Sequence, residues 1–570
     1  MEWLQIIITL LLFMIIVVPV GKYLYYVSTG HKIIGDKLFD KIDNFIYKIC
    51  GISKDDEMDW KEYIFSIIAV NAAMVFIGYI MLRAQGFLFF NPNKINGMEQ
   101  SLSFNTIISF MTNTNLQDYS GESGLSNFSQ MIVIIFMMFT SAATGFSAAI
   151  AFIRGIIGRK LIGNFFVDMT RVTTRVLLPL SIIVGILLVS QGVPQTLSGT
   201  KTVTTIEGKM QDIAIGPVAA LESIKHIGTN GGGFFGANSA HPFENPTPIS
   251  NLIEILSMMI LPGALVYTFG LMLRNKKQGW TIFGAMAGIF IIALPICYYA
   301  EKAGNPALAH VGLNQLMGNM EGKEVRFGVG QSALFATVTT SFTTGTVNNM
   351  HDSLTPIGGA IALMNMMLNV VFGGKGVGFM NMMMYAILTV FLCGLMVGRT
   401  PEFLSKKIEG KEIKLIALAI IIHPLLILMS SALALISPEG IAGISNSGFH
   451  GLTQIVYQFT SSAANNGSGF EGLGDNTLFW NTATGIVMFY GRYLSIIILL
   501  SVAGSLAAKR TIPTTIGTFR TDNTMFALTL IAIVLIIGAL TFLPALALGP
   551  IAEHLTLWNW LLWSRKQGEK

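Results

Sequence analysis

The sequence is poor in charge and in cysteine, and both shortages restrict what the chain can be. Of its 570 residues only 12% are charged, whereas 52% are hydrophobic, and the mean hydropathy is +0.62. This composition excludes an ordinary soluble domain and indicates a polytopic membrane protein. The three cysteines, Cys50, Cys297 and Cys393, provide neither a disulfide framework nor the spacing of metal ligands.

Sequence patterns for nucleotide hydrolysis are also missing. The chain contains no Gly-x-x-x-x-Gly-Lys-Ser/Thr phosphate loop and no Asp-Lys-Thr-Gly-Thr phosphorylation string. Residues 373–376, Gly-Gly-Lys-Gly, are the nearest lookalike, but no Ser or Thr follows them, and we interpret them as a break between helix halves. No Ser/His, His/Glu or paired Asp constellation recurs across the hydrophobic segments, which disfavours an intramembrane enzyme. We therefore expect no ATP site and no catalytic residue in this chain.

Long apolar segments predict how the chain is organised. A helix needs roughly 20 apolar residues to cross about 30 Å of hydrocarbon. By this measure we predict an all-α polytopic membrane protein with ten transmembrane helices, surrounded by membrane lipids. The net charge of +5 comes from basic residues spread over the loops, so no nucleic acid is expected as a partner. The predicted spans are 4–25, 63–83, 130–152, 176–193, 251–273, 279–300, 377–398, 413–436, 482–507 and 526–548.

The loops between these spans differ in charge, and the difference predicts an orientation. The first three residues carry one acid and no Lys or Arg, whereas the loop behind the first span is basic, so this span is not a cleavable signal peptide. Most loop Lys and Arg residues fall in alternate loops, which the positive-inside rule assigns to the cytoplasm. With ten spans, we expect both termini outside.

Four short, uncharged, oxygen-rich segments recur in the four long outer loops. They begin at residues 112, 229, 343 and 464, at intervals of 117, 114 and 121. Each closes a mildly apolar stretch about long enough for a short helix. The candidate ion-binding residues in these segments are Thr112, Asn113, Thr114, Asn115, Thr229, Asn230, Gly231, Gly232, Thr343, Thr344, Gly345, Thr346, Asn465, Asn466 and Gly467.

This recurrence predicts four helix–pore loop–helix repeats around one pore with fourfold pseudosymmetry. Non-helical backbone at membrane depth must be buried in protein or line a cavity, so four such loops satisfy one another only by converging. The expected units are an extra span with an inner connector (1–62), four pore repeats (63–175, 176–278, 279–412 and 413–525), and a last span with its tail (526–570).

The residue types in the four segments indicate a binding site for a dehydrated cation. Gly and Asn tolerate left-handed backbone, which lets successive carbonyls point to one side of the chain. None of the segments contains a carboxylate, and a neutral oxygen cage suits K⁺ better than Mg²⁺ or Ca²⁺. The alternative is that each segment is an ordinary turn, but four turns at even spacing on one side favour a selectivity filter.

Longer strings resemble a known family. Residues 228–235 (GTNGGGFF), 238–246 (NSAHPFENP), 350–353 (MHDS) and 461–468 (SSAANNGS) are similar to the potassium-translocating subunit (KdpA) of the Kdp-type K⁺-transporting ATPase. The resemblance runs essentially end to end. It implies a channel-like protein of the bacterial cell (inner) membrane that selects K⁺ from outside. It also implies three partners, namely the P-type ATPase subunit of the complex, one single-span subunit and often one very small subunit.

Five ionisable residues lie in or near the spans. Ionisable side chains in a membrane cost free energy and usually have a function, so we assign an expected role to each. For Arg492 we expect a role as a positive gate below the filter, which the family resemblance supports. The alternative is that Arg492 is a buried structural residue that pairs with carbonyl groups at a helix end. Glu254 and His423 are expected to be packing or interface residues. Glu244 and Asp352, just beyond two of the segments, either concentrate cations at the mouth or cap helices.

A self-sufficient K⁺ or Na⁺ uniporter or symporter is the alternative function. It would use the same four-loop pore and be driven by the membrane potential, at about 2.3 kcal/mol per charge per 100 mV.

Overall fold

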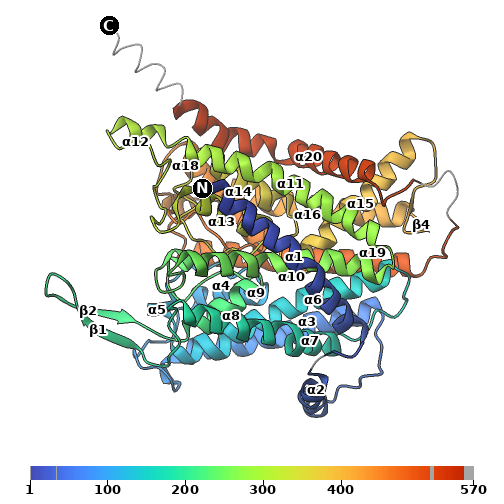
Figure 1. Ribbon diagram of the computed structural model, residues 1–570, viewed down its shortest axis with the longest axis horizontal. Coiled ribbons are helices and arrows are strands. Elements are labelled where there is room, and N and C mark those ends of the chain that lie inside the picture. The colour runs from blue at the N-terminus through green and yellow to red at the C-terminus, as the bar shows by residue number, and fades with distance from the viewer. Residues whose placement is uncertain (1, 34, 514–518, 558–570) are drawn as a thin grey trace, which may run out of the picture.

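The computed structural model describes residues 2–33, 35–513 and 519–557, and it is helical apart from two short hairpins. Within these ranges, ten helices are long and apolar enough to cross a membrane, and in Figure 1 most of them run roughly from left to right, with α1 crossing diagonally. They confirm the predicted all-α membrane fold. Their bounds are Glu2–Thr29, Trp60–Phe87, Ser129–Ile156, Phe165–Ser190, Pro248–Met272, Lys276–His310, Val377–Met396, Gly410–Ile436, Leu478–Ala507 and Thr524–Leu557.

The first half of the chain contains an amino-terminal span, an amphipathic connector and two helix–short helix–helix units. A π-helical turn precedes α6, and another joins α7 to α8. The elements are α1 (Glu2–Thr29), α2 (Asp36–Cys50), α3 (Trp60–Ala84), α4 (Gln100–Met111), α5 (Gly121–Gly124), α6 (Phe136–Ile156), α7 (Phe165–Val172), α8 (Leu178–Ser190), β1 (Thr200–Thr204), β2 (Met210–Ala214), α9 (Val218–Ile227) and α10 (Pro248–Met272).

The second half contains two more such units and a last span. The elements are α11 (Lys276–Lys302), α12 (Pro306–His310), α13 (Gly328–Ser341), α14 (Pro356–Leu368), α15 (Val377–Met396), β3 (Glu402–Phe403), β4 (Lys406–Lys407), α16 (Gly410–Ile436), α17 (Pro438–Ala442), α18 (Phe449–Ala464), α19 (Leu478–Ala507) and α20 (Thr524–Leu546).

The helix after the third short helix is interrupted, as the Gly-rich string at 373–376 predicts. α14 ends at Leu368, the next residue, Asn369, is left-handed with φ 47°, and α15 begins only at Val377. Gly373 and Gly376 also have positive φ values, 61° and 83°, which a side chain would strain. The sequence therefore places eight residues of non-helical backbone between two buried helices.

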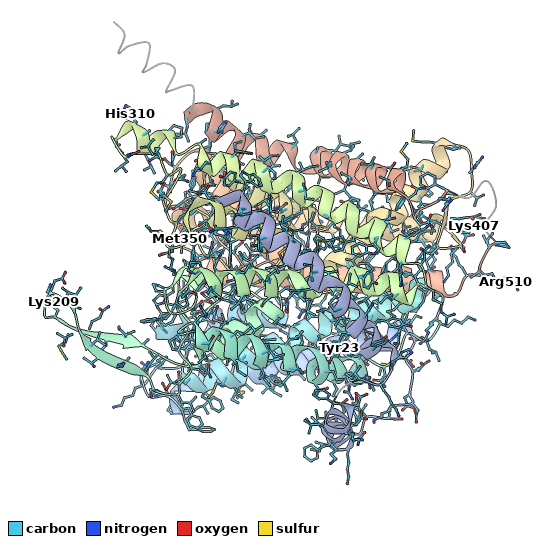
Figure 2. All side chains as sticks on the ribbon, in the orientation of Figure 1. Tyr23, Lys209, His310, Met350, Lys407 and Arg510 are labelled. Carbon is cyan, nitrogen blue, oxygen red and sulfur yellow. The ribbon has the colours of Figure 1, made fainter. Side chains whose placement is uncertain are left out.

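The loops fall into two groups at opposite ends of the helix bundle. Figure 2 shows Lys209, His310 and Met350 at one end, and Lys407 and Arg510 at the other. The first residues of α1 lie at the end that carries the β1–β2 hairpin and α12 (Figure 1). The predicted outer position of the carboxyl terminus concerns residues beyond 557, which lie outside the described part of the chain.

Candidate ion filter and its surroundings

The four short helices α4, α9, α13 and α18 end where the four polar segments begin. Their last residues are Met111, Ile227, Ser341 and Ala464, and almost all of their side chains are buried. The carboxyl-terminal end of a helix carries the negative end of its dipole. All four segments therefore start at an end of a helix that favours a cation.

Backbone conformation defines the equivalent positions of the four loops. The first left-handed residues are Asn113, Thr229, Thr343 and Asn465, with φ between 43° and 63°. Thr112 and Ala464 are thus level with the ends of the other two helices, so loops one and four begin one residue later than the sequence intervals assume.

Two of these left-handed residues are β-branched. Thr229 and Thr343 have φ values of 43° and 49°, a region where β-branched side chains are outliers. Such a conformation costs of order 1–3 kcal/mol and persists only where the surroundings enforce it, most often at functional sites. The strain at both positions marks the start of the loops as a constrained segment.

Backbone carbonyl oxygens from three loops surround one point beside the fourth. A methyl group on the α-carbon of Gly231 would lie 3.0, 3.2 and 3.4 Å from the carbonyl oxygens of Thr114, Thr344 and Asn466, respectively. These three residues hold the same position in loops one, three and four, because each backbone N–H donates to the carbonyl five residues earlier. All four loops therefore meet at a single point.

Side-chain hydrogen bonds close the four loops into a ring. Each adjacent pair of loops is joined by at least one such bond, and an Asn amide is the donor in three of the four bonds named here. The bonds are Asn230 Nδ2 to Asn113 Oδ1 (2.9 Å), Ser239 Oγ with Thr346 Oγ1 (3.1 Å), Asn466 Nδ2 to the Thr339 carbonyl (3.0 Å) and Asn465 Nδ2 to Thr114 Oγ1 (3.0 Å).

All the candidate filter residues are buried except Gly467, which is half-buried. The Thr112 hydroxyl donates to the Ile108 carbonyl at 2.8 Å and so closes its own helix. A cavity of about 270 Å³ lies next to the loops and is lined by one residue from each, namely Asn115, Gly232, Gly345 and Gly467. We call it the vestibule, because it is where the four loops open.

The interruption between α14 and α15 contacts the start of three loops. The backbone N–H of Lys375 donates to Thr229 Oγ1 at 3.0 Å. Asn369 Oδ1 lies 3.3 Å from Thr343 Oγ1, and Asn369 Nδ2 donates to the Ala464 carbonyl at 3.3 Å. The interruption therefore lies against the loops on the side opposite to the vestibule.

Arg492 of α19 approaches the same region. Its Nη2 donates to the Ser141 carbonyl at 3.3 Å, and its guanidinium and the Lys375 carbonyl both contact Gly145 of α6. Arg492 makes no ion pair with any described residue, and Lys375 Nζ has no hydrogen-bond partner among them. Two buried basic side chains without carboxylate partners thus accompany the interruption. The sequence did not lead us to expect the one on Lys375.

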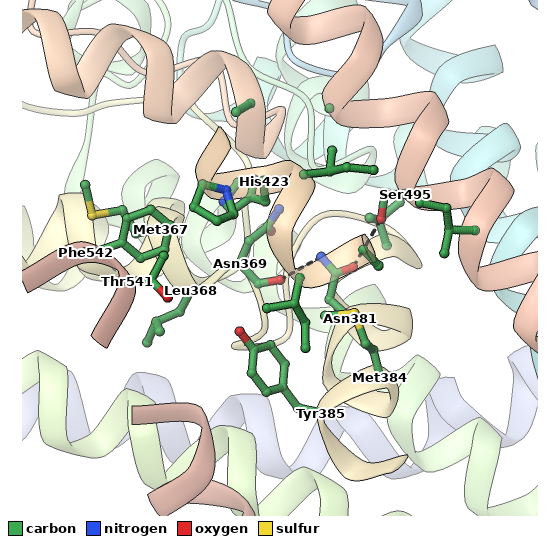
Figure 3. A pocket seen from close by; sticks show the side chains of 18 residues that line it. Met367, Leu368, Asn369, Asn381, Met384, Tyr385, His423, Ser495, Thr541 and Phe542 are labelled. Atoms are coloured by element: carbon green, nitrogen blue, oxygen red, sulfur yellow. Dashed lines mark hydrogen bonds between the residues drawn. The ribbon is translucent and has the colours of Figure 1, made fainter. Parts of the chain in front are cut away.

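A small cavity with both apolar and polar lining continues from the interruption, between α15, α16, α19 and α20. It has a volume of about 50 Å³, and Figure 3 shows its lining. Asn381 Nδ2 donates to the Asn369 carbonyl at 3.1 Å, and Ser495 Oγ donates to Asn381 Oδ1 at 3.2 Å. His423, on the opposite wall, has its Nε2 3.2 Å from the Met366 carbonyl. The cavity is large enough for a water-sized guest and offers it oxygen ligands.

A fully buried charged network, which we did not predict from the sequence, supports the second loop. Lys225 Nζ lies 2.6 Å from Glu222 and 3.0 Å from Glu244, and His226 Nε2 lies 3.3 Å from Glu254. All five side chains are completely buried. The signal that could have revealed it is three ionisable residues inside a short apolar helix directly before a candidate filter segment.

Two acids expected at the mouth or at helix caps have other partners. Glu244, besides pairing with Lys225, accepts a hydrogen bond from the Phe235 N–H at 2.7 Å. Asp352 Oδ1 lies 3.0 Å from His450 Nε2 and accepts a bond from Gln454. Neither carboxylate lines the vestibule.

The arrangement defines a class of protein, a multi-pass helical membrane protein in which four loops after short helices converge. The crystal structure of the potassium transporter TrkH from Vibrio parahaemolyticus has a similar fold, with a TM-score of 0.52 and 16% identity over 87% of this chain and 97% of that chain.

The family described as the potassium-transporting ATPase A subunit (KdpA) matches residues 7–555, so the chain belongs to this family. The potassium-transporting ATPase potassium-binding subunit of Clostridium acetobutylicum is 67% identical over 98% of this chain and 100% of that protein. The protein of the same name from Geobacillus kaustophilus is 58% identical over 96% of this chain and 98% of that protein.

Proposed function

We propose that this chain is the K⁺-selective, channel-like translocating component of an ATP-driven K⁺ import complex. The observation that carries the proposal is the group of buried carbonyl oxygens of Thr114, Thr344 and Asn466 around one point beside Gly231. Neutral carbonyls at the ends of four helix dipoles replace the water of a large monovalent cation, and they do not offer the carboxylates that divalent cations prefer.

In this proposal the vestibule faces the outside of a bacterial inner membrane, and the amino terminus lies on the same side. The charge of the loops supports this orientation, since the opposite end of the bundle carries most of the basic residues. The energy comes from the P-type ATPase subunit of the complex. The names of the relatives support an ATPase complex. The family resemblance adds one single-span subunit and often one very small subunit to this assembly.

We further propose that the ion leaves the filter through the cavity of Figure 3, past its polar groups, towards the ATPase partner. Arg492 acts as a positive gate below the filter, because its charge has no carboxylate partner in the described chain and lies beside the interrupted helix. This charge opposes a free leak of cations down the membrane potential.

Reconstitution tests this function. The full chain is purified with its ATPase partner and the two smaller partners and placed in liposomes, and ATP hydrolysis and ⁸⁶Rb⁺ uptake are measured against external K⁺. We expect both activities to saturate with K⁺ and uptake to stop without ATP. Uptake by the chain alone, driven by a membrane potential, would instead support the self-sufficient uniporter or symporter.

A further inference from the structure

Two aspartates from different repeats meet at the edge of the vestibule. Asp118 follows the first loop, and Asp475 lies between the fourth loop and α19. Both residues line the vestibule. They therefore lie where an ion would enter the filter.

The two side chains lack the donors that a pair of carboxylates requires. Asp118 is only 5% exposed, and neither of its carboxylate oxygens has a hydrogen-bond donor among the described residues. Asp475 Oδ2 accepts one bond, from Gln458 Nε2 at 2.8 Å. The two carboxyl groups are within hydrogen-bonding reach of each other. Two acceptors in this position need a proton or a cation between them.

The surroundings give this pair no fixed positive charge. Within the described chain, no Lys, Arg or His lines the vestibule, and the other ionisable residues on its wall are Glu471 and Tyr119. Burial, together with the charge of Asp475, raises the pKa of Asp118 well above its usual range. Burial raises the pKa of Asp475 to about 6 and that of Glu471 to about 8. The wall of the vestibule therefore takes up protons near neutral pH.

We propose that Asp118 and Asp475 form an outer cation site, which holds K⁺ at the mouth of the filter and which protons occupy in competition with K⁺. The inference rests on the proposed function, because it assigns the step before the filter. At this site the ion keeps part of its water and is attracted by charge. In the filter it loses that water to neutral oxygens. The pair concentrates K⁺ when it is ionised and stops doing so when it is protonated.

The test measures the apparent K⁺ affinity of uptake by the reconstituted complex at several external pH values. For the wild type, we expect the affinity to fall about tenfold between pH 8 and pH 5, as focused charge in a cleft raises local cation concentration by roughly 10-fold or more. Asp118→Asn and Asp475→Asn should each lower the affinity at pH 8 and flatten its pH dependence. Both variants should purify with the ATPase partner in wild-type yield, which shows that they fold.

Two further variants separate this role from a structural one. Asp118→Glu keeps the carboxylate and should restore most of the pH dependence. Asp212→Asn removes an exposed acid from the β1–β2 hairpin, at the same end of the molecule but outside the vestibule, and should change nothing.

The proposal is overturned if both Asn variants transport K⁺ with wild-type affinity and the wild-type pH dependence. A wild-type complex whose uptake shows no dependence on K⁺ at any pH would refute the proposed function itself. The two failures are therefore distinguishable in one set of measurements.

Discussion

Substitution of Gly231 by alanine tests the convergence of the four loops directly. The new methyl group would meet three carbonyl oxygens at 3.0–3.4 Å, closer than the 3.4–4 Å of ordinary van der Waals contact. The φ of Gly231 is not in the left-handed region, so the methyl group adds no backbone strain and acts only on these oxygens. We expect at least one oxygen to lose its contact with the ion.

The size of the effect follows from the value of one such contact. A hydrogen bond to a charged group contributes about 1.5–3 kcal/mol, and we take an ion–carbonyl contact as similar. Since 1.4 kcal/mol corresponds to a factor of ten, Gly231→Ala should weaken the apparent K⁺ affinity about ten- to a hundredfold. The measurement is ⁸⁶Rb⁺ uptake by the reconstituted complex over a range of external K⁺.

A matched control comes from Gly284 of α11. A methyl group there has no neighbour within 4 Å, so Gly284→Ala should leave the K⁺ affinity unchanged. The same change in a helix stabilises by about 1 kcal/mol, so the control should express at least as well as the wild type. The reasoning is refuted if Gly231→Ala is correctly inserted and captures K⁺ as tightly as the control does.

Three further substitutions test the charges around the filter. Arg492→Gln should raise the passive K⁺ leak of liposomes at least about tenfold. A unit charge near the ion path raises the energy of a passing cation by several kcal/mol at an effective dielectric constant of about 20. Arg492→Lys keeps the charge and should not raise the leak. Lys225→Met should lower the free energy of unfolding by about 3–5 kcal/mol in a thermal unfolding assay, since it leaves two buried carboxylates without their cation. As a control, Lys302→Met breaks a half-exposed pair and should lower the free energy of unfolding by less than about 1 kcal/mol in the same assay. Burial lowers the pKa of His450, but hydrogen bonds to two carboxylates outweigh this effect and raise the pKa from 6.5 to about 10. The stabilisation that His450 provides is therefore complete below pH 6.5 and is lost as the pH rises to about 10. The stability of His450→Gln should not decline over this interval as that of the wild type does.

Each of these three expectations has a contrary result. Tight liposomes with Arg492→Gln would remove the gate. A thermal midpoint of Lys225→Met equal to that of Lys302→Met would mean that the buried network is not ionised. Parallel stability curves for His450→Gln and the wild type between pH 6.5 and pH 10 would mean that His450 is neutral in the folded protein.

The ten spans, the interruption at 373–376 and the four polar segments that the structure places together could all be predicted from the sequence. The spans could be predicted because the cost of exposing backbone in hydrocarbon applies to each segment separately, so each segment must be long and apolar by itself. The interruption was readable because glycine marks positions of positive φ, as at Gly373 and Gly376.

Other features depend on contacts between distant parts of the chain. The register of loops one and four follows from where the backbone first becomes left-handed, at Asn113 and Asn465, and this position is set by capping bonds and packing as much as by composition. Glu244 and Asp352 lie next to the loops in sequence, yet their side chains turn to Lys225 and His450 because buried or partly buried carboxylates need partners.

By itself, then, the sequence determined which segments lie in the membrane and which backbone segments can replace the water around a cation. Both are local properties of composition. Only the tertiary structure decided which oxygens face one point, and that Asp118 and Asp475, from the first and last repeats, lie side by side at the vestibule. The physical reason is that coordination and charge repulsion act through space, over distances of a few ångströms that the order of residues does not encode.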